Sequence, residues 1–93
     1  MKEYLVATIK GRLFEIKRIS TSNFGTWYSI TVMLNNHEVK YSMNNVCKGV
    51  WKIVTLRLPT VIYTYENDLC DLIEKNEMHE KQTGYKPRFG LTV

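Results

Sequence analysis

The side chains best suited to chemistry in this sequence are two histidines and two cysteines, His37, Cys47, Cys70 and His79. Zinc sites use such side chains, commonly with two ligands only a few residues apart. Here the successive separations are ten, twenty-three and nine residues, so no close ligand pair exists. We therefore expect no metal site, and we expect both cysteines to be reduced and packed as small apolar side chains.

Acid–base catalysis can use a histidine beside a carboxylate, and His37-Glu38 and His79-Glu80 are adjacent in the sequence. Neighbours on a strand point to opposite faces, however, and His37 lies at the expected mouth of a hairpin. The chain has no P-loop, dinucleotide fingerprint or Gly-x-Ser-x-Gly elbow, and its five glycines are scattered. The sequence predicts a protein that is not an enzyme and that binds no cofactor.

Basic and aromatic side chains give the main functional signal, because charge is distributed unevenly along the chain. Residues 1–57 carry a net charge of +6, residues 66–80 a net charge of −5, and residues 81–93 a net charge of +3. Lys and Arg gain affinity for phosphates by releasing counterions, and exposed aromatic rings can stack on unpaired bases. The candidate nucleic-acid or partner-binding residues are Lys10, Arg12, Lys17, Arg18, Trp27, Tyr28, Lys40, Tyr41, Lys52, Lys86 and Arg88.

Single-stranded nucleic acid suits this pattern better than a duplex does. No expected helix is basic enough to enter a major groove, so the partner would be RNA, single-stranded DNA or a nucleoprotein complex. The alternative without a binding role is that the basic side chains only form the solvent-exposed face of a sheet, while the aromatic rings pack in its core. A pI of about 9.1 is a modest excess for a nucleic-acid-binding protein, and no RNA-recognition consensus is present.

A protein-directed inhibitor or adaptor is the alternative function. Its acidic residues Asp71, Glu74 and Glu77 would dock on a host protein, where complementary charge favours fast and selective association. Exposed Trp and Tyr would act as anchors. Abundant Lys, Asn and Tyr are typical of AT-rich coding, as in many phages and mobile elements, for which an accessory or anti-defence role would fit. The same acids could instead solvate the helix or pair with the basic sheet.

Length and hydropathy indicate one small domain, residues 1–93, with a single modest core. No stretch approaches the roughly 20 apolar residues needed to span a bilayer, and residues 1–9 do not resemble a signal peptide. We expect a cytoplasmic protein with no membrane contact. A homodimer is compatible with the sequence, because Trp27–Leu34 or the terminal segment could be an exposed edge that pairs with a second copy.

The elements expected to position these residues begin with two β-hairpins. Gly11 and the pair Asn35-Asn36 tolerate the positive φ of a tight turn. The four arms are Tyr4–Lys10, Arg12–Ile19, Trp27–Leu34 and His37–Ser42. A fifth strand is expected over Val50–Leu58, which is rich in β-branched residues and ends at Pro59. Apolar residues on both of its faces predict a central strand.

A helix is expected after Pro59. Apolar residues recur there at the spacing of one helix face, at Val61, Ile62, Tyr65, Leu69, Leu72 and Ile73. Thr60 and Asn67 are both suitable N-caps, and we favour a start before Asn67, with an end near Gln82 and Gly84 as the C-cap. Phe89, Leu91 and Val93 alternate as in a further edge strand. The predicted fold is α+β, an antiparallel sheet of five to six strands with one helix from the C-terminal half packed on it.

Overall fold

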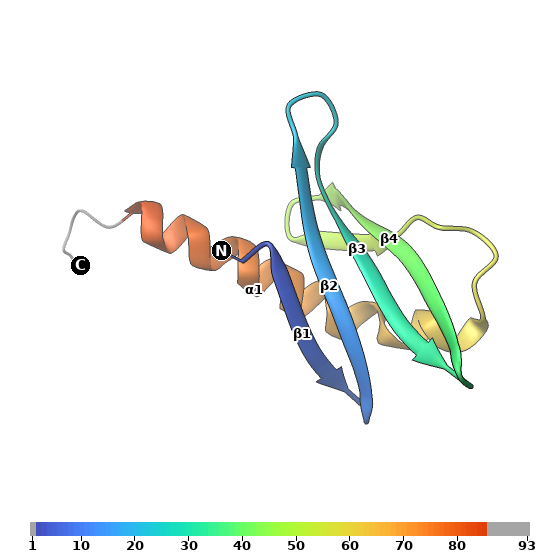
Figure 1. Cartoon of the computed structure of the whole chain (residues 1–93). Coiled ribbons are helices and arrows are strands. Elements are labelled where there is room, and N and C mark those ends of the chain that lie inside the picture. The colour runs from blue at the N-terminus through green and yellow to red at the C-terminus, as the bar shows by residue number, and fades with distance from the viewer. Residues whose placement is uncertain (1, 86–93) are drawn as a thin grey trace.

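The computed structural model describes residues 2–85, with side chains described through Met78. It has the predicted α+β fold: a five-stranded antiparallel sheet in the order β1-β2-β3-β4-β5, with one long helix packed on one face (Figure 1). The elements are β1 (Tyr4–Ile9), β2 (Arg12–Thr21), β3 (Gly25–Leu34), β4 (His37–Cys47), β5 (Val50–Ile53), the 3₁₀ helix η1 (Thr60–Tyr65) and α1 (Glu66–Tyr85). No helix among these residues is long and apolar enough to cross a bilayer.

Both predicted hairpins are confirmed, and each has a two-residue turn. Lys10 and Gly11 have φ values of +51° and +81°, and Asn35 and Asn36 have φ values of +49° and +66°. Positive φ at both central residues is the geometry of the turn whose twist matches the twist of the flanking strands. β3 lies in the centre of the sheet, so the expectation that Trp27–Leu34 could be an exposed edge is wrong.

The strand predicted over Val50–Leu58 is wrong in both length and position. β5 covers only Val50–Ile53 and forms an edge of the sheet, next to β4. The last contact of this ladder is a hydrogen bond of 3.0 Å from the Val54 N–H to the Ser42 carbonyl. The chain then turns away, and Leu56 is 81% exposed. Apolar residues on both faces of a short segment therefore did not indicate a buried strand here.

The helix begins close to its predicted start. One 3₁₀ segment follows Pro59, and the α-helix begins at Glu66, just before Asn67. Its end differs from the prediction, because α1 runs through Gly84 to Tyr85 and Gly84 is therefore not a C-cap. The possible strand containing Phe89, Leu91 and Val93 lies outside the described residues.

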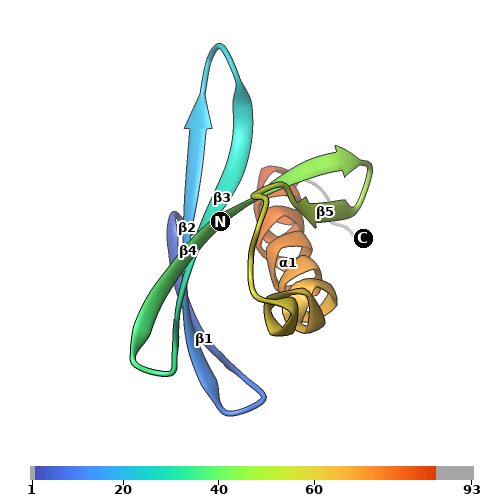
Figure 2. The same cartoon turned by 90° about the vertical axis from the view of Figure 1, so that its right-hand side faces the viewer.

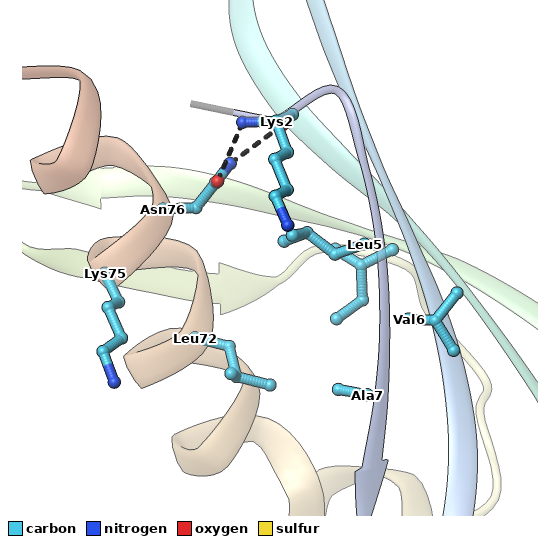
Figure 3. Close-up of a pocket in the computed structure, with 8 residues that line it drawn as sticks. Lys2, Leu5, Val6, Ala7, Leu72, Lys75 and Asn76 are labelled. Atoms are coloured by element: carbon cyan, nitrogen blue, oxygen red, sulfur yellow. Dashed lines mark hydrogen bonds between the residues drawn. The ribbon is translucent and has the colours of Figure 1, made fainter.

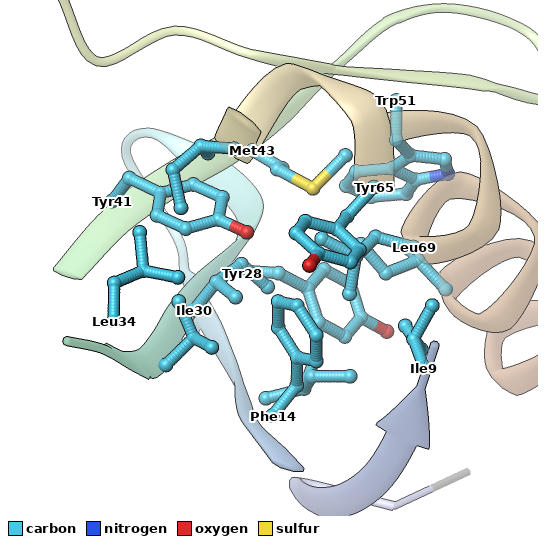
Figure 4. Close-up of a cluster of buried hydrophobic side chains, with 14 residues drawn as sticks. Ile9, Phe14, Tyr28, Ile30, Leu34, Tyr41, Met43, Trp51, Tyr65 and Leu69 are labelled. Carbon is cyan, nitrogen blue, oxygen red and sulfur yellow. The ribbon is translucent and has the colours of Figure 1, made fainter. Parts of the chain in front are cut away.

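The core lies between α1 and the face of the sheet that α1 covers, which we call the inner face (Figure 4). Alternate residues of each strand point toward the helix, and two aromatic pairs pack there, one between β2 and η1 and one between β3 and β5. Phe14 meets Tyr65 with ring centroids 5.0 Å apart, and Tyr28 meets Trp51 at 5.2 Å, both edge to face. Seen from the side, β5 and the end of β4 bend over α1 (Figure 2). No described residue covers the opposite face of the sheet, which we call the outer face.

Candidate functional site

Arg18, a predicted binding residue, points inward from β2 and is paired with the helix. Its Nε donates to Oε2 of Glu77 over 2.8 Å, and its Nη1 lies 3.5 Å from a Glu3 carboxylate oxygen. The hydrogen bond that Arg18 donates to Glu77 raises the pKa of Arg18, and the neighbouring acidic charge acts in the same direction. Because this guanidinium already has two carboxylate partners, it is not available as a site for phosphate.

Three more of the predicted cations contact the helix or the 3₁₀ segment. Arg12 donates from Nε to the Tyr65 hydroxyl over 3.0 Å and from Nη1 to the Met33 carbonyl over 3.1 Å. The Lys10 ammonium lies 5.7 Å from the centre of the Tyr65 ring, and the Lys52 ammonium lies 3.7 Å from Glu66 Oε1. These cations therefore do not form one basic surface.

The predicted aromatic stacking residues Tyr28 and Tyr41 are in the core, so their assignment to an accessible surface is wrong. Tyr28 is fully buried and Tyr41 nearly so. The Tyr28 hydroxyl donates to Glu77 and accepts from Asn76 Nδ2 at 3.0 Å. Burial raises the pKa of both hydroxyls, and the bond to Glu77 raises that of Tyr28 further. The sequence could not show which alternate face of each strand meets the helix.

The acids of α1 also face inward for the most part. Glu74 accepts a hydrogen bond of 3.0 Å from the Trp51 indole, and Glu66 accepts one of 2.8 Å from the Ile53 N–H. Glu74 and Glu77 are half-buried, and of the three predicted acidic docking residues only Asp71 is exposed. The opposite charges of the sheet and the helix therefore meet across their interface, and these three acids do not form one exposed patch.

The outer face carries a group of exposed apolar side chains. Tyr4, Val6, Leu13 and Met33 are each more than half exposed there, and Trp27 is half-buried. Strand pairing places these side chains in rows, with Leu13 opposite Thr8 and Trp27 opposite Ile19. An ordinary solvated sheet face would be polar at such positions.

Charges of both signs lie among these apolar groups. Lys17 and Lys40, two of the predicted binding residues, are here together with Glu15 and Glu38, so the charged side chains of the outer face sum to zero. A shallow hollow of about 310 Å³ is lined by Tyr4, Glu15, Lys17, Ser29, Thr31 and Lys40. The remaining candidates, Lys86 and Arg88, lie outside the described residues.

A second hollow lies between β1 and α1 and was not anticipated from the sequence. It has a volume of about 310 Å³ and is lined mostly by apolar side chains, with Lys2, Lys75 and Asn76 as its polar members (Figure 3). The signal for it was present in Tyr4–Ile9, where apolar residues occupy both alternating sets and so leave both faces of β1 apolar.

Metal-ligating residues do not converge in the described part of the chain. No group of three His, Cys, Asp or Glu side chains there could hold an ion. His37 is exposed at its hairpin, and the side chain of His79 is outside the description. Cys47 and Cys70 are both free thiols, but Cys47 is exposed, so its predicted packing is wrong. Cys70 is half-buried and its sulfur lies 3.3 Å from the Trp51 backbone nitrogen.

Comparison with known proteins identified no relative: no family model matches the sequence, and neither a curated protein nor a solved structure matches it.

Proposed function

We propose that this protein is a non-catalytic binding protein, an adaptor or inhibitor, that docks on another protein through the outer face of its sheet. The observation that carries the proposal is the exposure of Tyr4, Val6, Leu13 and Met33 on one uncovered face. Exposed apolar patches with polar neighbours are characteristic of protein interaction sites. Tyr4 and Trp27 would serve as anchors, because Tyr and Trp are enriched at interface hot spots.

The charges on this face favour a protein over a nucleic acid. Phosphate binding gains its free energy from cations that replace counterions, and here Lys17 and Lys40 are offset by Glu15 and Glu38. Those acids would repel a polyanion. A protein interface accommodates both signs, since paired rim charges set the selectivity and the rate of association.

The test compares two double variants that place the same charges on differently located apolar residues. Leu13→Glu with Met33→Glu alters the outer face, whereas Val54→Glu with Leu56→Glu alters exposed apolar residues in the loop that follows β5. A tagged wild-type protein is used to capture partners from a lysate treated with nuclease, and each captured protein is identified and purified. We expect the purified partner to bind the loop variant like the wild type and to bind the outer-face variant at least about tenfold more weakly.

A nucleic-acid target would give the opposite pattern. Binding of a fluorescent single-stranded oligonucleotide would then fall steeply with salt, and Lys17→Glu with Lys40→Glu would abolish it. Arg18 is left unchanged in this test, because a change there would also break its ion pair with Glu77. Salt-sensitive oligonucleotide binding that this pair removes would overturn the proposal.

A further inference from the structure

The free edge of β1 has open backbone groups. β1 pairs only with β2. The hydrogen bond of 2.8 Å from the Arg18 N–H to the Glu3 carbonyl fixes which residues of β1 direct their backbone groups toward β2. In an antiparallel ladder bonded pairs alternate, so the N–H and C=O groups of Tyr4, Val6 and Thr8 point away from β2. Within the described chain none of these outward groups has a hydrogen-bond partner.

Asn76 on α1 already occupies the first position along this edge. Lys2 lies just before β1, ahead of a bend at Glu3, and its backbone N–H donates to Asn76 Oδ1 over 3.0 Å. The Lys2 carbonyl accepts from Asn76 Nδ2, also over 3.0 Å (Figure 3). A side-chain amide thus bonds Lys2 as the peptide group of a neighbouring strand would, and the ladder stops there although the edge continues.

An apolar groove adjoins the open edge. Leu5 and Ala7 line it from β1, Ile16 from β2 and Leu72 from α1, around a volume of about 310 Å³ (Figure 3). A strand added beside β1 would lie about 4.8 Å away and would point every second side chain toward α1. Those side chains would enter this groove, which gives the edge a means of selecting among sequences.

The charges at the groove select an acidic occupant. Lys2 and Lys75 line it, and neither ammonium has a carboxylate within 4.0 Å among the described residues. A second copy paired with this edge about a two-fold axis at Val6 would place Lys2 of each copy opposite Lys10 of the other. Like charges placed directly opposite destabilise a strand pair. Self-pairing in this register is therefore disfavoured, whereas a segment with acidic residues would be complementary to both lysines.

From these features we propose that the β1 edge and its groove bind an extended segment of a partner protein as a sixth strand, with apolar side chains in the groove and acidic side chains at Lys2 and Lys75. This inference rests on the proposed function and names a second contact. It is tested separately, because the groove lies on the opposite side of the sheet from Leu13 and Met33.

The test uses defined peptides. Fluorescein-labelled Ac-ETVTVTVTE-NH2 places three valines and two terminal glutamates on one face of a strand, and Ac-KTVTVTVTK-NH2 is its charge-reversed control. We expect the acidic peptide to bind at least about tenfold more tightly in fluorescence anisotropy at low salt. Lys2→Glu with Lys75→Glu should reverse this preference. Lys17→Glu with Lys40→Glu makes the same charge change on the outer face and should leave the preference intact.

Amide hydrogen exchange provides the readout that a general charge attraction would not change. The acidic peptide should slow exchange at Tyr4, Val6 and Thr8, whose N–H groups point outward, and leave Leu5 and Ala7 as they were. Equal binding of the two peptides, or no such alternation, would overturn the proposal even if the outer-face variant loses its partner. If amide protection at this edge rises with protein concentration without peptide, the edge pairs with a second copy. If a chain ending at Tyr85 binds the peptide more tightly than the full chain does, residues 86–93 compete for the edge. Either result also overturns it.

Discussion

Arg18 on β2 and Glu77 on α1 form an ion pair with an Nε–Oε2 distance of 2.8 Å, and their side chains are only 11% and 17% exposed. The same carboxylate oxygen accepts the Tyr28 hydroxyl, which in turn accepts from Asn76. Four polar side chains from two strands and the helix therefore form one connected group beside the core. Because each partner fixes the next, the group sets where α1 lies along the sheet.

Breaking the Arg18–Glu77 pair should destabilise the fold. Arg18→Ala removes the guanidinium from the half-buried Glu77 carboxylate, and we expect a loss of about 2 kcal/mol in the free energy of unfolding, between the values for surface and buried pairs. Lys17→Ala is the control on the exposed side of the same strand and should change stability by less than about 0.5 kcal/mol. Urea unfolding measures both. Equal losses in the two variants would contradict a specific role for the pair.

Removing either of two tyrosine hydroxyls from the core should change the stability of the protein in different ways. Tyr28→Phe removes a hydroxyl with two hydrogen-bond partners and should cost about 1–3 kcal/mol. The Tyr41 hydroxyl is buried with no hydrogen-bond partner among the described residues, so Tyr41→Phe should be neutral or stabilising by up to about 1 kcal/mol. Urea midpoints at pH 7 make the comparison. A larger loss for Tyr41→Phe than for Tyr28→Phe would show that the two environments are assigned wrongly.

Alkaline pH should unfold the protein through the same two residues. Burial raises the pKa of Tyr28 and Tyr41 in the folded state, whereas the unfolded chain loses these protons near pH 10. Above about pH 10 the folded state thus holds more protons, and stability falls as pH rises, by up to about 2.7 kcal/mol per pH unit for two groups. The raised pKa of Arg18 has no effect in this window, because the guanidinium stays protonated in both the folded and the unfolded chain there.

The alkaline prediction is checked with urea unfolding at several pH values above 9. The wild-type free energy of unfolding should bend downward, and Tyr41→Phe should reduce the limiting slope by about 1.4 kcal/mol per pH unit. This variant is preferred because it leaves the Glu77 cluster unchanged. An identical slope in Tyr41→Phe would mean that other groups cause the alkaline loss.

The sequence predicted the elements better than it predicted the surfaces. Both hairpins followed from residues that accept positive φ, and the presence of a helix after Pro59 followed from its apolar spacing, because these signals are local. The length of β5 did not follow. Val54 and Leu56 have strand-forming composition, but the Val54–Ser42 bond is the last backbone–backbone hydrogen bond of the ladder, and the next contact with β4 is made by the Thr55 side chain, which accepts from the Ser42 N–H.

The candidate site was harder to predict because it depends on which alternate face meets the helix. In β3 the outward set holds Trp27 and the inward set holds Tyr28, and both sets contain aromatic and β-branched residues. Charge along the chain was equally ambiguous. Cations on the sheet and acids on α1 can form two separate binding surfaces, or they can pair with each other. The Arg18–Glu77 contact, between residues 59 positions apart, decides this and is visible only in three dimensions.

The loop after β5 contains backbone strain that a single change should relieve. Arg57 has φ = +62°, a conformation that costs a non-glycine residue about 1 kcal/mol, and its side chain is exposed. Arg57→Gly should raise the free energy of unfolding by up to about 1 kcal/mol, reduced by the greater freedom of glycine in the unfolded chain. Arg57→Ala removes the same charge and keeps the strain, so it should give no gain. Thermal and urea unfolding of the two variants separate the causes. A gain in Arg57→Ala as large as that in Arg57→Gly would assign the effect to the guanidinium and its neighbouring charges, because only the glycine variant changes what the backbone tolerates at this position.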